Sequence, residues 1–410
     1  MLCALCAPVA SQPQPGADGR VTLTYTDAHA KEVEVEGSGG IGGEMRRDGG
    51  RWTLTTDMLP SDLYAYRFIV DGDRAMADPA NPMWERDVTD TVSLLLIKGY
   101  PGSYYADNPG VLRGTVRKMW YPSSLNGMSR RRLSVYLPPQ YFATDTARFP
   151  VLYLLHGTGG DEDAWLGLGR LRQIMDNMIG EGRCRPMIVV MPNGNAQLAS
   201  APEGSPSEAQ TSSMQSMLGM VEKAFPEEVM PFIESQFRTI ADKRHRAIAG
   251  LSLGGLHALF ISANNPQMFD YIGLFSPQTT TTLPEKGMRG LRSIAGGISD
   301  FTASLPFVSD KWKENVGRKM RRTEHTDIYS GIDDKLAAQF ATPPALYYIA
   351  VGRSDMIKSL VDKHRKRLDA LGCQYTYSES AGGHTWQNWR RYLLDFLPAL
   401  FRDGGATGDK

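Results

Sequence analysis

The sequence predicts two folded domains of different class, a small all-β sandwich and then a larger α/β domain with a mostly parallel sheet. Residues 20–100 contain short runs in which apolar and polar residues alternate, with turn residues between them. From residue 131 onward, apolar blocks alternate with longer segments of helical spacing, as in layered α/β domains. The length of 410 residues is sufficient for two or three domains.

The first residues have the character of a processed segment. Residues 2–10 are apolar, end in small residues and give way to a polar, proline-containing stretch. This resembles the apolar core and cleavage region of a secretory signal, although the positively charged start is missing. We interpret residues 1–19 as a clipped signal and linker, which predicts a secreted or periplasmic bacterial protein. The alternative is an ordinary flexible N-terminus.

The β-sandwich is predicted from closely spaced strands. The alternating runs cover residues 21–25, 33–36, 51–55 and 63–70. The last run leads into Asp71-Gly72, a strong signal for a hairpin turn. Because strands at this spacing leave no room for helices, we predict a small immunoglobulin-like sandwich over residues 20–100. Residues 101–130 are rich in turn-forming Gly and Pro, and we predict that they connect the two domains.

The α/β domain is predicted over residues 131–402. Apolar blocks nearly free of polar residues suit strands that are buried on both faces of a parallel sheet. The predicted strands cover residues 150–155, 187–191, 246–249, 271–275 and 346–351, and the predicted helices cover 225–237 and 356–371. Residues 277–343 show no clear buried strand and are interpreted as an insertion, a candidate cap over the site. The tail, residues 403–410, is predicted to be disordered.

Composition limits the classes of function. Lys and Arg total 45 and Asp and Glu total 45, so the formal net charge is zero, which argues against a nucleic-acid partner. No apolar run approaches the ~20 residues of a membrane-spanning helix, so no membrane span is expected. The acidic cluster at residues 161–163 has no His or Cys beside it and is interpreted as the first turn of a helix. We predict no cofactor and no metal.

A nucleophile motif follows one predicted strand. Gly250-Leu-Ser252-Leu-Gly254 has the form G-x-S-x-G, directly after an apolar strand and before a segment compatible with a helix. A nucleophilic serine must stand on a turn so sharp that larger neighbours would collide, so glycine is needed on both sides. We predict that Ser252 is the nucleophile. A merely structural turn is the alternative.

A second glycine-rich loop follows the strand at residues 151–155. An oxyanion formed by attack on an ester needs two backbone N–H groups. We expect one from Leu253, directly after the nucleophile, and the other from Thr158 in the loop His156-Gly-Thr-Gly-Gly160. The alternative, a phosphate-binding loop, is disfavoured because the lysine of a P-loop and the third glycine of a dinucleotide motif are absent.

The base and acid follow from elimination and chain order. Of the seven histidines, only His384 lies on a glycine-released loop after a late strand, where a base should reach over the sheet edge. Nine aspartates lie between Ser252 and His384, and Asp355 is the one directly beyond a strongly apolar strand. There its carboxylate can accept a hydrogen bond from the imidazole. Glu379, which ends the strand beside His384, is the main rival.

These motifs, in this order and with Trp165, strongly resemble the putative-esterase family of α/β-hydrolases over roughly residues 115–402. That family includes feruloyl esterases of carbohydrate esterase family 1, enterochelin esterases, S-formylglutathione hydrolases and mycolyltransferases. Residues 45–52, 63–72 and 78–82 resemble carbohydrate-binding module family 48. Residues 36–43 lack the aromatic residue usual in such modules, so this domain could instead only shape the rim of the active site.

The resemblance implies a serine carboxylic-ester hydrolase with an α/β-hydrolase three-layer sandwich. The expected substrate is a hydroxycinnamoyl (feruloyl-type) ester on a plant cell-wall polysaccharide such as xylan. Trp386 is a candidate wall for the aromatic acyl group, with core packing as the alternative. The rivals are an enterochelin-type siderophore esterase, an acetyl esterase and, from another class, a carbohydrate-binding protein with a silent hydrolase domain. The complete Ser, Asp and His set argues against the last.

Overall fold

The computed structural model describes residues 12–88, 90–195, 198–201, 219–279 and 326–402. The chain divides into two compact units, Met1–Ala106 and Asp107–Lys410. The interpretations of residues 1–11 as part of a signal, of 280–325 as most of a cap and of 403–410 as a disordered tail therefore lie outside the described residues.

The first unit is all-β, as the sequence predicts. One antiparallel sheet has the order β1-β5-β4, and the other has the order β3-β2-β6-β9-β8, with β7 paired to β6. Its strands are β1 (Thr22–Thr26), β2 (Val33–Gly37), β3 (Gly42–Glu44), β4 (Arg46–Asp48), β5 (Arg51–Thr55), β6 (Asp62–Val70), β7 (Arg74–Met76), β8 (Trp84–Asp87) and β9 (Asp90–Ile97). Alternating residues such as Leu23, Val35 and Phe68 form its core, because successive strand side chains face opposite sides.

The second unit is built on an eight-stranded sheet with the order β10-β11-β13-β12-β14-β15-β16-β17. The pairs β10-β11 and β11-β13 are antiparallel, and all later pairs are parallel. Its strands are β10 (Thr115–Pro122), β11 (Arg130–Leu137), β12 (Val151–Leu155), β13 (Ile188–Pro192), β14 (Arg246–Leu251), β15 (Tyr271–Phe275), β16 (Leu346–Gly352) and β17 (Thr376–Ser380). Strands β12, β13 and β15 are buried at every position, which accounts for their apolar sequences.

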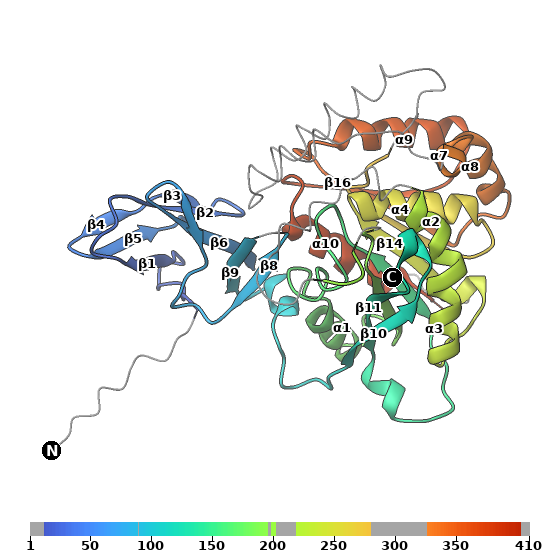
Figure 1. The fold of residues 1–410 in the computed structure, drawn as a ribbon, viewed down its shortest axis with the longest axis horizontal. Helices are drawn as coiled ribbons and strands as arrows, with labels where there is room; N and C mark the ends of the chain where they lie inside the picture. Colours follow the sequence, from blue (N-terminus) through green and yellow to red (C-terminus); the bar gives the residue numbers. More distant parts are fainter. Residues whose placement is uncertain (1–11, 89, 196–197, 202–218, 280–325, 403–410) are drawn as a thin grey trace, which may run out of the picture. The chain divides into compact units, whose positions relative to one another are not determined.

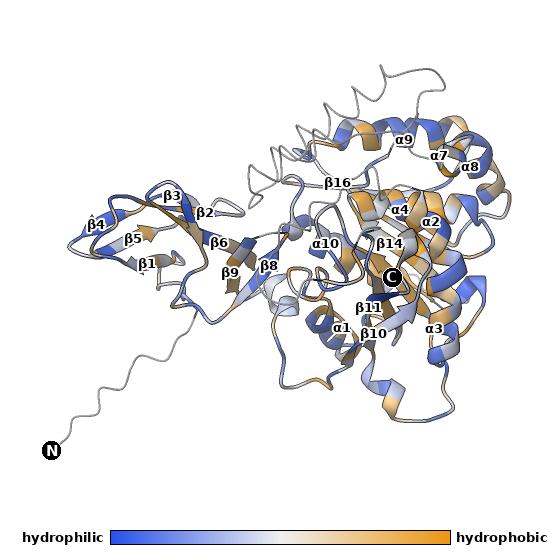
Figure 2. Ribbon diagram, in the orientation of Figure 1, coloured by the Kyte–Doolittle hydropathy of each residue, from blue (hydrophilic) through white to orange (hydrophobic). Residues whose placement is uncertain are grey.

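Helices cover both faces of this sheet. Figure 1 shows α1 and α10 on one side and α2, α3 and α4 on the other. The helices are α1 (Leu171–Gly180), α2 (Met220–Ala224), α3 (Met230–Gln236), α4 (Leu253–Asn264), α7 (Thr326–Tyr329), α8 (Ile332–Ala341), α9 (Lys358–Ala370) and α10 (Trp386–Phe396). Short 3-10 turns lie at Gly102–Tyr105, Leu125–Gly127, Pro139–Phe142, Lys243–His245 and Leu397–Ala399. Figure 2 shows that the apolar residues concentrate in the central strands and in α4.

Two boundaries differ from the prediction. The connection predicted at residues 101–130 is too long, because β10 within it pairs with β11. Most of its residues are exposed at the sheet edge, so the strand lacks the apolar block used to recognise buried strands. The helix predicted at 225–237 is interrupted by a π-helical turn at Phe225–Val229, where Pro226 has no N–H to donate.

The described part of the predicted cap is α7 and α8. Both contact α4, and Leu336 of α8 is fully buried. These residues therefore pack beside α4, which itself contacts β14 and β15. Among the described residues, no helix has the length and apolar character needed to cross a membrane.

Candidate active site

Ser252 stands on a sharp turn between β14 and α4. Its φ is 52° and its ψ is −116°, a region that non-glycine residues seldom occupy. A Cβ on Gly250 would lie 2.9 Å from the nitrogen of Gly255. A Cβ on Gly254 would lie 2.5 Å from the carbonyl oxygen of Leu155. The turn therefore requires both glycines of the G-x-S-x-G motif.

The backbone of Ser252 is hydrogen-bonded through its N–H and its carbonyl, whereas its hydroxyl makes no hydrogen bond within the described residues. The Ser252 N–H donates to the Phe275 carbonyl at 2.9 Å, and the Ser252 carbonyl accepts from the Gln278 N–H at 3.0 Å. The hydroxyl oxygen is buried and makes no hydrogen bond within the described residues. A buried polar group without a partner is costly and therefore needs an explanation. A reacting substrate provides one.

The glycine-rich loop after β12 lies directly against Ser252. A Cβ on Gly157 would lie 3.2 Å from the Ser252 Cβ, so only glycine lets the loop approach this closely. Thr158 follows in the loop. Leu253 is the first residue of α4, and the amide of a first helical residue has no acceptor within its helix. The structure thus places the nucleophile beside the loop and the helix start that carry the two predicted oxyanion donors.

His384 and Asp355 lie side by side, as predicted from the chain order. His384 Nδ1 is 3.0 Å from Asp355 Oδ1 and 3.1 Å from Oδ2, and both side chains are buried. Because an ionised carboxylate only accepts, the imidazole must donate through Nδ1. Burial acts to raise the pKa of Asp355, but the hydrogen bond and charge of His384 outweigh it and lower that pKa. Asp355 is therefore ionised at neutral pH.

The rival acid, Glu379, faces another way. It accepts a hydrogen bond from the Tyr377 hydroxyl at 2.8 Å and lies 3.2 Å from Lys358 Nζ, on a partly exposed surface. These two groups lower the pKa of Glu379. Its neighbours in the parallel sheet are strand residues of β16, with Val351 as its register partner.

Other histidines have structural partners. His257, on α4, lies 2.8 Å from Glu222, and His364 lies 3.2 Å from the Tyr347 hydroxyl; both are buried. Burial lowers the pKa of His364 to about 3.

An aromatic cluster extends from His384. Trp386 is half-buried and packs edge-to-face between Trp165 and Trp389, at centroid distances of 5.3 and 5.2 Å. The ring stacked edge-to-face on His384 is that of Trp389, at 4.9 Å. Trp389 was missed in the sequence, although its position three residues after Trp386 places both on one helical face.

The acidic cluster at residues 161–163 does not begin a helix, so that interpretation was wrong: residues 162–169 form turns, and α1 begins at Leu171. Glu162 is buried, pairs with Arg132 at 2.5 Å and accepts from the Asn193 amide at 2.8 Å. Within the ranges that the structure describes, no group of three or more His, Cys, Asp or Glu side chains could hold a metal ion.

The fold and this arrangement place the chain among the α/β-hydrolases. Residues 124–400 match the model of the family described as "Putative esterase". The chain therefore belongs to the putative esterase family, as its motifs indicate.

Individual relatives carry esterase names. An endo-1,4-beta-xylanase/feruloyl esterase of Xylanibacter ruminicola is 31% identical over 304 residues, covering 70% of this chain and 39% of that protein. An esterase of Mycobacterium tuberculosis is 28% identical, covering 68% of this chain and 58% of that protein. The chain thus spans about two to three fifths of the length of these curated relatives.

Solved structures share the fold. A CE1 ferulic acid esterase of the fungus Anaeromyces mucronatus covers 73% of this chain and 96% of its own, with 21% identity and a TM-score of 0.51. The enterobactin esterase of Shigella flexneri covers 92% of both chains, with 17% identity and a TM-score of 0.61. The second likeness extends over the N-terminal unit.

Proposed function

We propose that this chain hydrolyses carboxylic esters through Ser252, His384 and Asp355. The observation that carries the proposal is the buried His384–Asp355 pair, on the loops that follow β17 and β16, in the same unit as an elbow serine whose hydroxyl makes no hydrogen bond with the described protein. The missing hydrogen bond between serine and histidine does not oppose this role, since such bonds often tighten only when substrate binds.

The proposed reaction has two halves. In the first, Ser252 Oγ attacks the ester carbonyl while His384 Nε2 takes the hydroxyl proton and then delivers it to the departing alcohol. In the second, water attacks the acyl-serine while His384 takes its proton. The bond between the acyl carbon and Ser252 Oγ then breaks, His384 returns the proton to Oγ, and the acid leaves. Asp355 stabilises the imidazolium in both halves. The Leu253 and Thr158 amides hold the oxyanion that forms each time.

The substrate that we favour is a hydroxycinnamoyl ester on plant polysaccharide. The name of the Xylanibacter relative includes feruloyl esterase, and that protein is 31% identical over 70% of this chain. Half-buried Trp386, packed against the buried rings of Trp165 and Trp389, offers aromatic surface near His384 for a phenolic acyl group.

A siderophore esterase is the second candidate. It is favoured by one specific observation, the likeness to the Shigella enterobactin esterase over 92% of the chain. That likeness concerns the fold.

A hydrolysis panel distinguishes these candidates. It comprises methyl ferulate, acetylated xylan, 4-nitrophenyl acetate and a ferric catecholate ester, each compared by kcat/KM. We expect methyl ferulate to exceed the catecholate ester by at least an order of magnitude, as differential transition-state binding requires. The reverse ranking would move the assignment to the siderophore esterase. No turnover of any ester would sink the proposed function.

We also propose that the N-terminal unit targets the secreted or periplasmic enzyme to polysaccharide. Trp84 on β8 is 59% exposed, and an exposed indole is a suitable platform for stacking on a sugar ring. Trp84→Ala should reduce binding to insoluble xylan while leaving turnover of 4-nitrophenyl acetate within twofold. Equal binding by both proteins would remove this role. A fusion of residues 1–19 to a periplasm-dependent reporter tests the location.

A further inference from the structure

His156, the first residue of the oxyanion loop, is held in one neutral tautomer. Its Nε2 accepts from the Gly194 N–H at 2.7 Å, and its Nδ1 lies 2.8 Å from the Gly157 carbonyl. A nitrogen that accepts an N–H cannot itself carry a proton, so the proton must be on Nδ1, which donates to Gly157. Burial lowers the pKa of His156 to about 4, so this state persists at neutral pH.

This hydrogen bond fixes the direction of the predicted oxyanion donor. The carbonyl of Gly157 and the N–H of Thr158 belong to the same peptide plane and point in opposite directions across a trans bond. The Gly157 carbonyl also accepts from the Gly160 N–H at 3.1 Å. With its carbonyl held on one side by two donors, the peptide must present the Thr158 N–H on the other side, away from the imidazole.

A second loop holds the first. Residues 193–195 follow β13, and the Asn195 side-chain amide donates to the Gly160 carbonyl at 2.7 Å. The Gly194 N–H that binds His156 belongs to the same loop. The two loops therefore meet at both ends of the His156–Gly160 segment, and the position of one depends on the position of the other.

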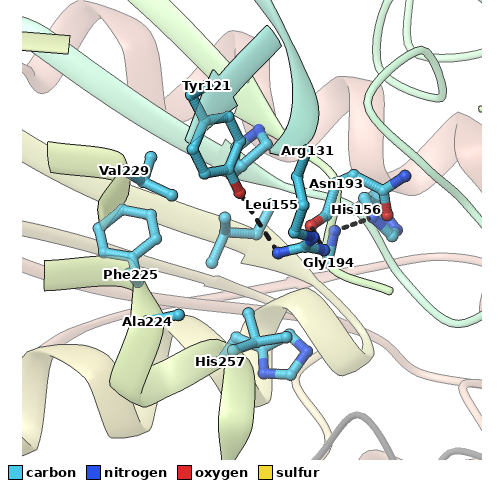
Figure 3. A pocket seen from close by; sticks show the side chains of 12 residues that line it. Tyr121, Arg131, Leu155, His156, Asn193, Gly194, Ala224, Phe225, Val229 and His257 are labelled. Atoms are coloured by element: carbon cyan, nitrogen blue, oxygen red, sulfur yellow. Dashed lines mark hydrogen bonds between the residues drawn. The ribbon is translucent and has the colours of Figure 1, made fainter. Parts of the chain in front are cut away.

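The guanidinium group of Arg131 binds this second loop, residues 193–195. Its Nη2 donates to the carbonyls of Asn193 and Asn195, at 2.5 and 2.7 Å, and its Nη1 donates to the Tyr121 hydroxyl at 3.3 Å. Figure 3 shows Arg131 between Tyr121 and the Asn193–Gly194 backbone, with His156 bound to Gly194 beyond it.

Burial of the charged guanidinium of Arg131 costs free energy of folding. The side chain is 2% exposed, its printed hydrogen bonds go to two carbonyls and one hydroxyl, and its Nε makes no hydrogen bond within the described residues. A buried guanidinium whose acceptors are all neutral is expensive to desolvate. Its geometry explains this position, because the two N–H groups of one nitrogen, Nη2, bind two carbonyl oxygens of the same tight loop.

We propose that Arg131 is a positioning residue for the oxyanion hole, acting through the 193–195 loop and His156 on the Thr158 amide. The inference rests on the esterase mechanism proposed above. Arg131 touches no reacting atom in this scheme. It determines where an amide that binds the transition state points.

The test compares three variants of the full chain. Arg131→Met removes the fork, and Asn195→Ala removes only the contact to Gly160. Tyr121→Phe is the matched control, because it removes the third acceptor of Arg131 and leaves both loop carbonyls bound. Each is assayed with 4-nitrophenyl acetate and with phenylboronic acid, which forms a tetrahedral adduct on a reactive serine.

A misplaced oxyanion donor binds the transition state less tightly and leaves binding of the ground-state substrate almost unchanged. Loss of a whole donor costs ~10²–10³ in kcat, so we expect Arg131→Met to lower kcat by about 10–10². KM should change less than about threefold, and the Ki of phenylboronic acid should rise by the same factor as kcat falls. Asn195→Ala should show the same pattern at smaller size, and Tyr121→Phe should match the unaltered chain.

Circular dichroism and the thermal midpoint identify a variant that fails to fold. If Arg131→Met does not fold, Asn195→Ala alone tests the inference. Folded variants with unchanged kcat and boronate Ki would overturn the inference, and so would a loss in KM alone. If the unaltered chain itself neither turns over ester nor binds phenylboronic acid, the failure belongs to the proposed function instead.

Discussion

In the N-terminal unit, the buried polar side chains near residues 78–83 bond to one another. In the second unit, two buried hydroxyls at the carboxyl edge of the sheet make no hydrogen bond within the described residues. The Tyr66 hydroxyl donates to Asp78 at 2.6 Å, and the Asn81 amide donates to the Tyr66 oxygen at 3.2 Å. The hydroxyl oxygens of Ser252 and Thr158 are buried and make no hydrogen bond within the described residues.

This difference separates two uses of a buried polar group. A closed network fixes a turn, and its energy appears in the free energy of unfolding. A buried polar group without a hydrogen-bond partner lowers the free energy of unfolding. Such a group is retained where a ligand supplies the missing hydrogen bond. Substitutions in the two units should therefore affect different observables.

The largest effect is expected at the nucleophile. Ser252→Ala should lower ester turnover by about 10⁴–10⁶, since triad members act as a unit. The thermal midpoint should not fall, because the lost hydroxyl makes no hydrogen bond in the described protein. Steady-state kinetics measure the loss of turnover, and a thermal melting curve measures the midpoint. A folded Ser252→Ala protein with ordinary activity would end the assignment.

The second effect separates the two candidate acids. Asp355→Asn should lower kcat by about 10²–10⁴, because the imidazole loses the carboxylate that fixes its tautomer and stabilises its charge. Glu379→Gln is the matched control and should remain within a few-fold, since Glu379 binds Tyr377 and Lys358. A reversed ranking would transfer the acid to Glu379.

The third effect belongs to the N-terminal unit. Asp78→Ala deprives the Tyr66 hydroxyl of its acceptor and should lower the free energy of unfolding of this unit by roughly 1–3 kcal/mol. Turnover of 4-nitrophenyl acetate should not change. Asp57→Ala, at a side chain that is 96% exposed, serves as the control. Urea unfolding measures the effect, and an activity loss in Asp78→Ala would break the proposed separation.

The last effect concerns pH and involves stability only. Burial lowers the pKa of His364 to about 3, while an unfolded chain titrates near its ordinary value of ~6.5. Between these values the unfolded state binds more protons, so stability falls as pH falls, by about 1.4 kcal/mol per pH unit for one histidine.

His364→Phe should therefore reduce the dependence of the free energy of unfolding on pH, between about pH 6 and 4, by about 1.4 kcal/mol per pH unit. The check is urea unfolding of the variant and of the unaltered chain at several pH values. Tyr347→Phe is the matched control, because it removes the hydroxyl beside His364 and leaves the imidazole buried, so it should keep the slope. Identical slopes for His364→Phe and the unaltered chain would contradict this reading of burial.

Much of the fold could be predicted because its central strands are buried on both faces. Such strands must be continuously apolar, and the block at residues 271–275 coincides with β15. Strand β10 was missed since an edge strand with one exposed face has no such block. Asp355 could be placed because a parallel sheet brings consecutive strand ends together. Arg131 could not, because the two loop groups that it binds are backbone carbonyls more than sixty residues away, which leave no trace in residue identity.

Strand β17 carries a consequence for the lifetime of the enzyme. It is the last strand of the sheet order and contains no buried residue. Among the bonds that hold the loop between it and His384 are those from the Arg353 and Ser354 amides to the Ser380 and Gly382 carbonyls. Edge elements open locally at a lower free energy than the core. Amide protons of β17 should exchange before those of β14, and mild heating should inactivate the enzyme while most of its tertiary structure persists.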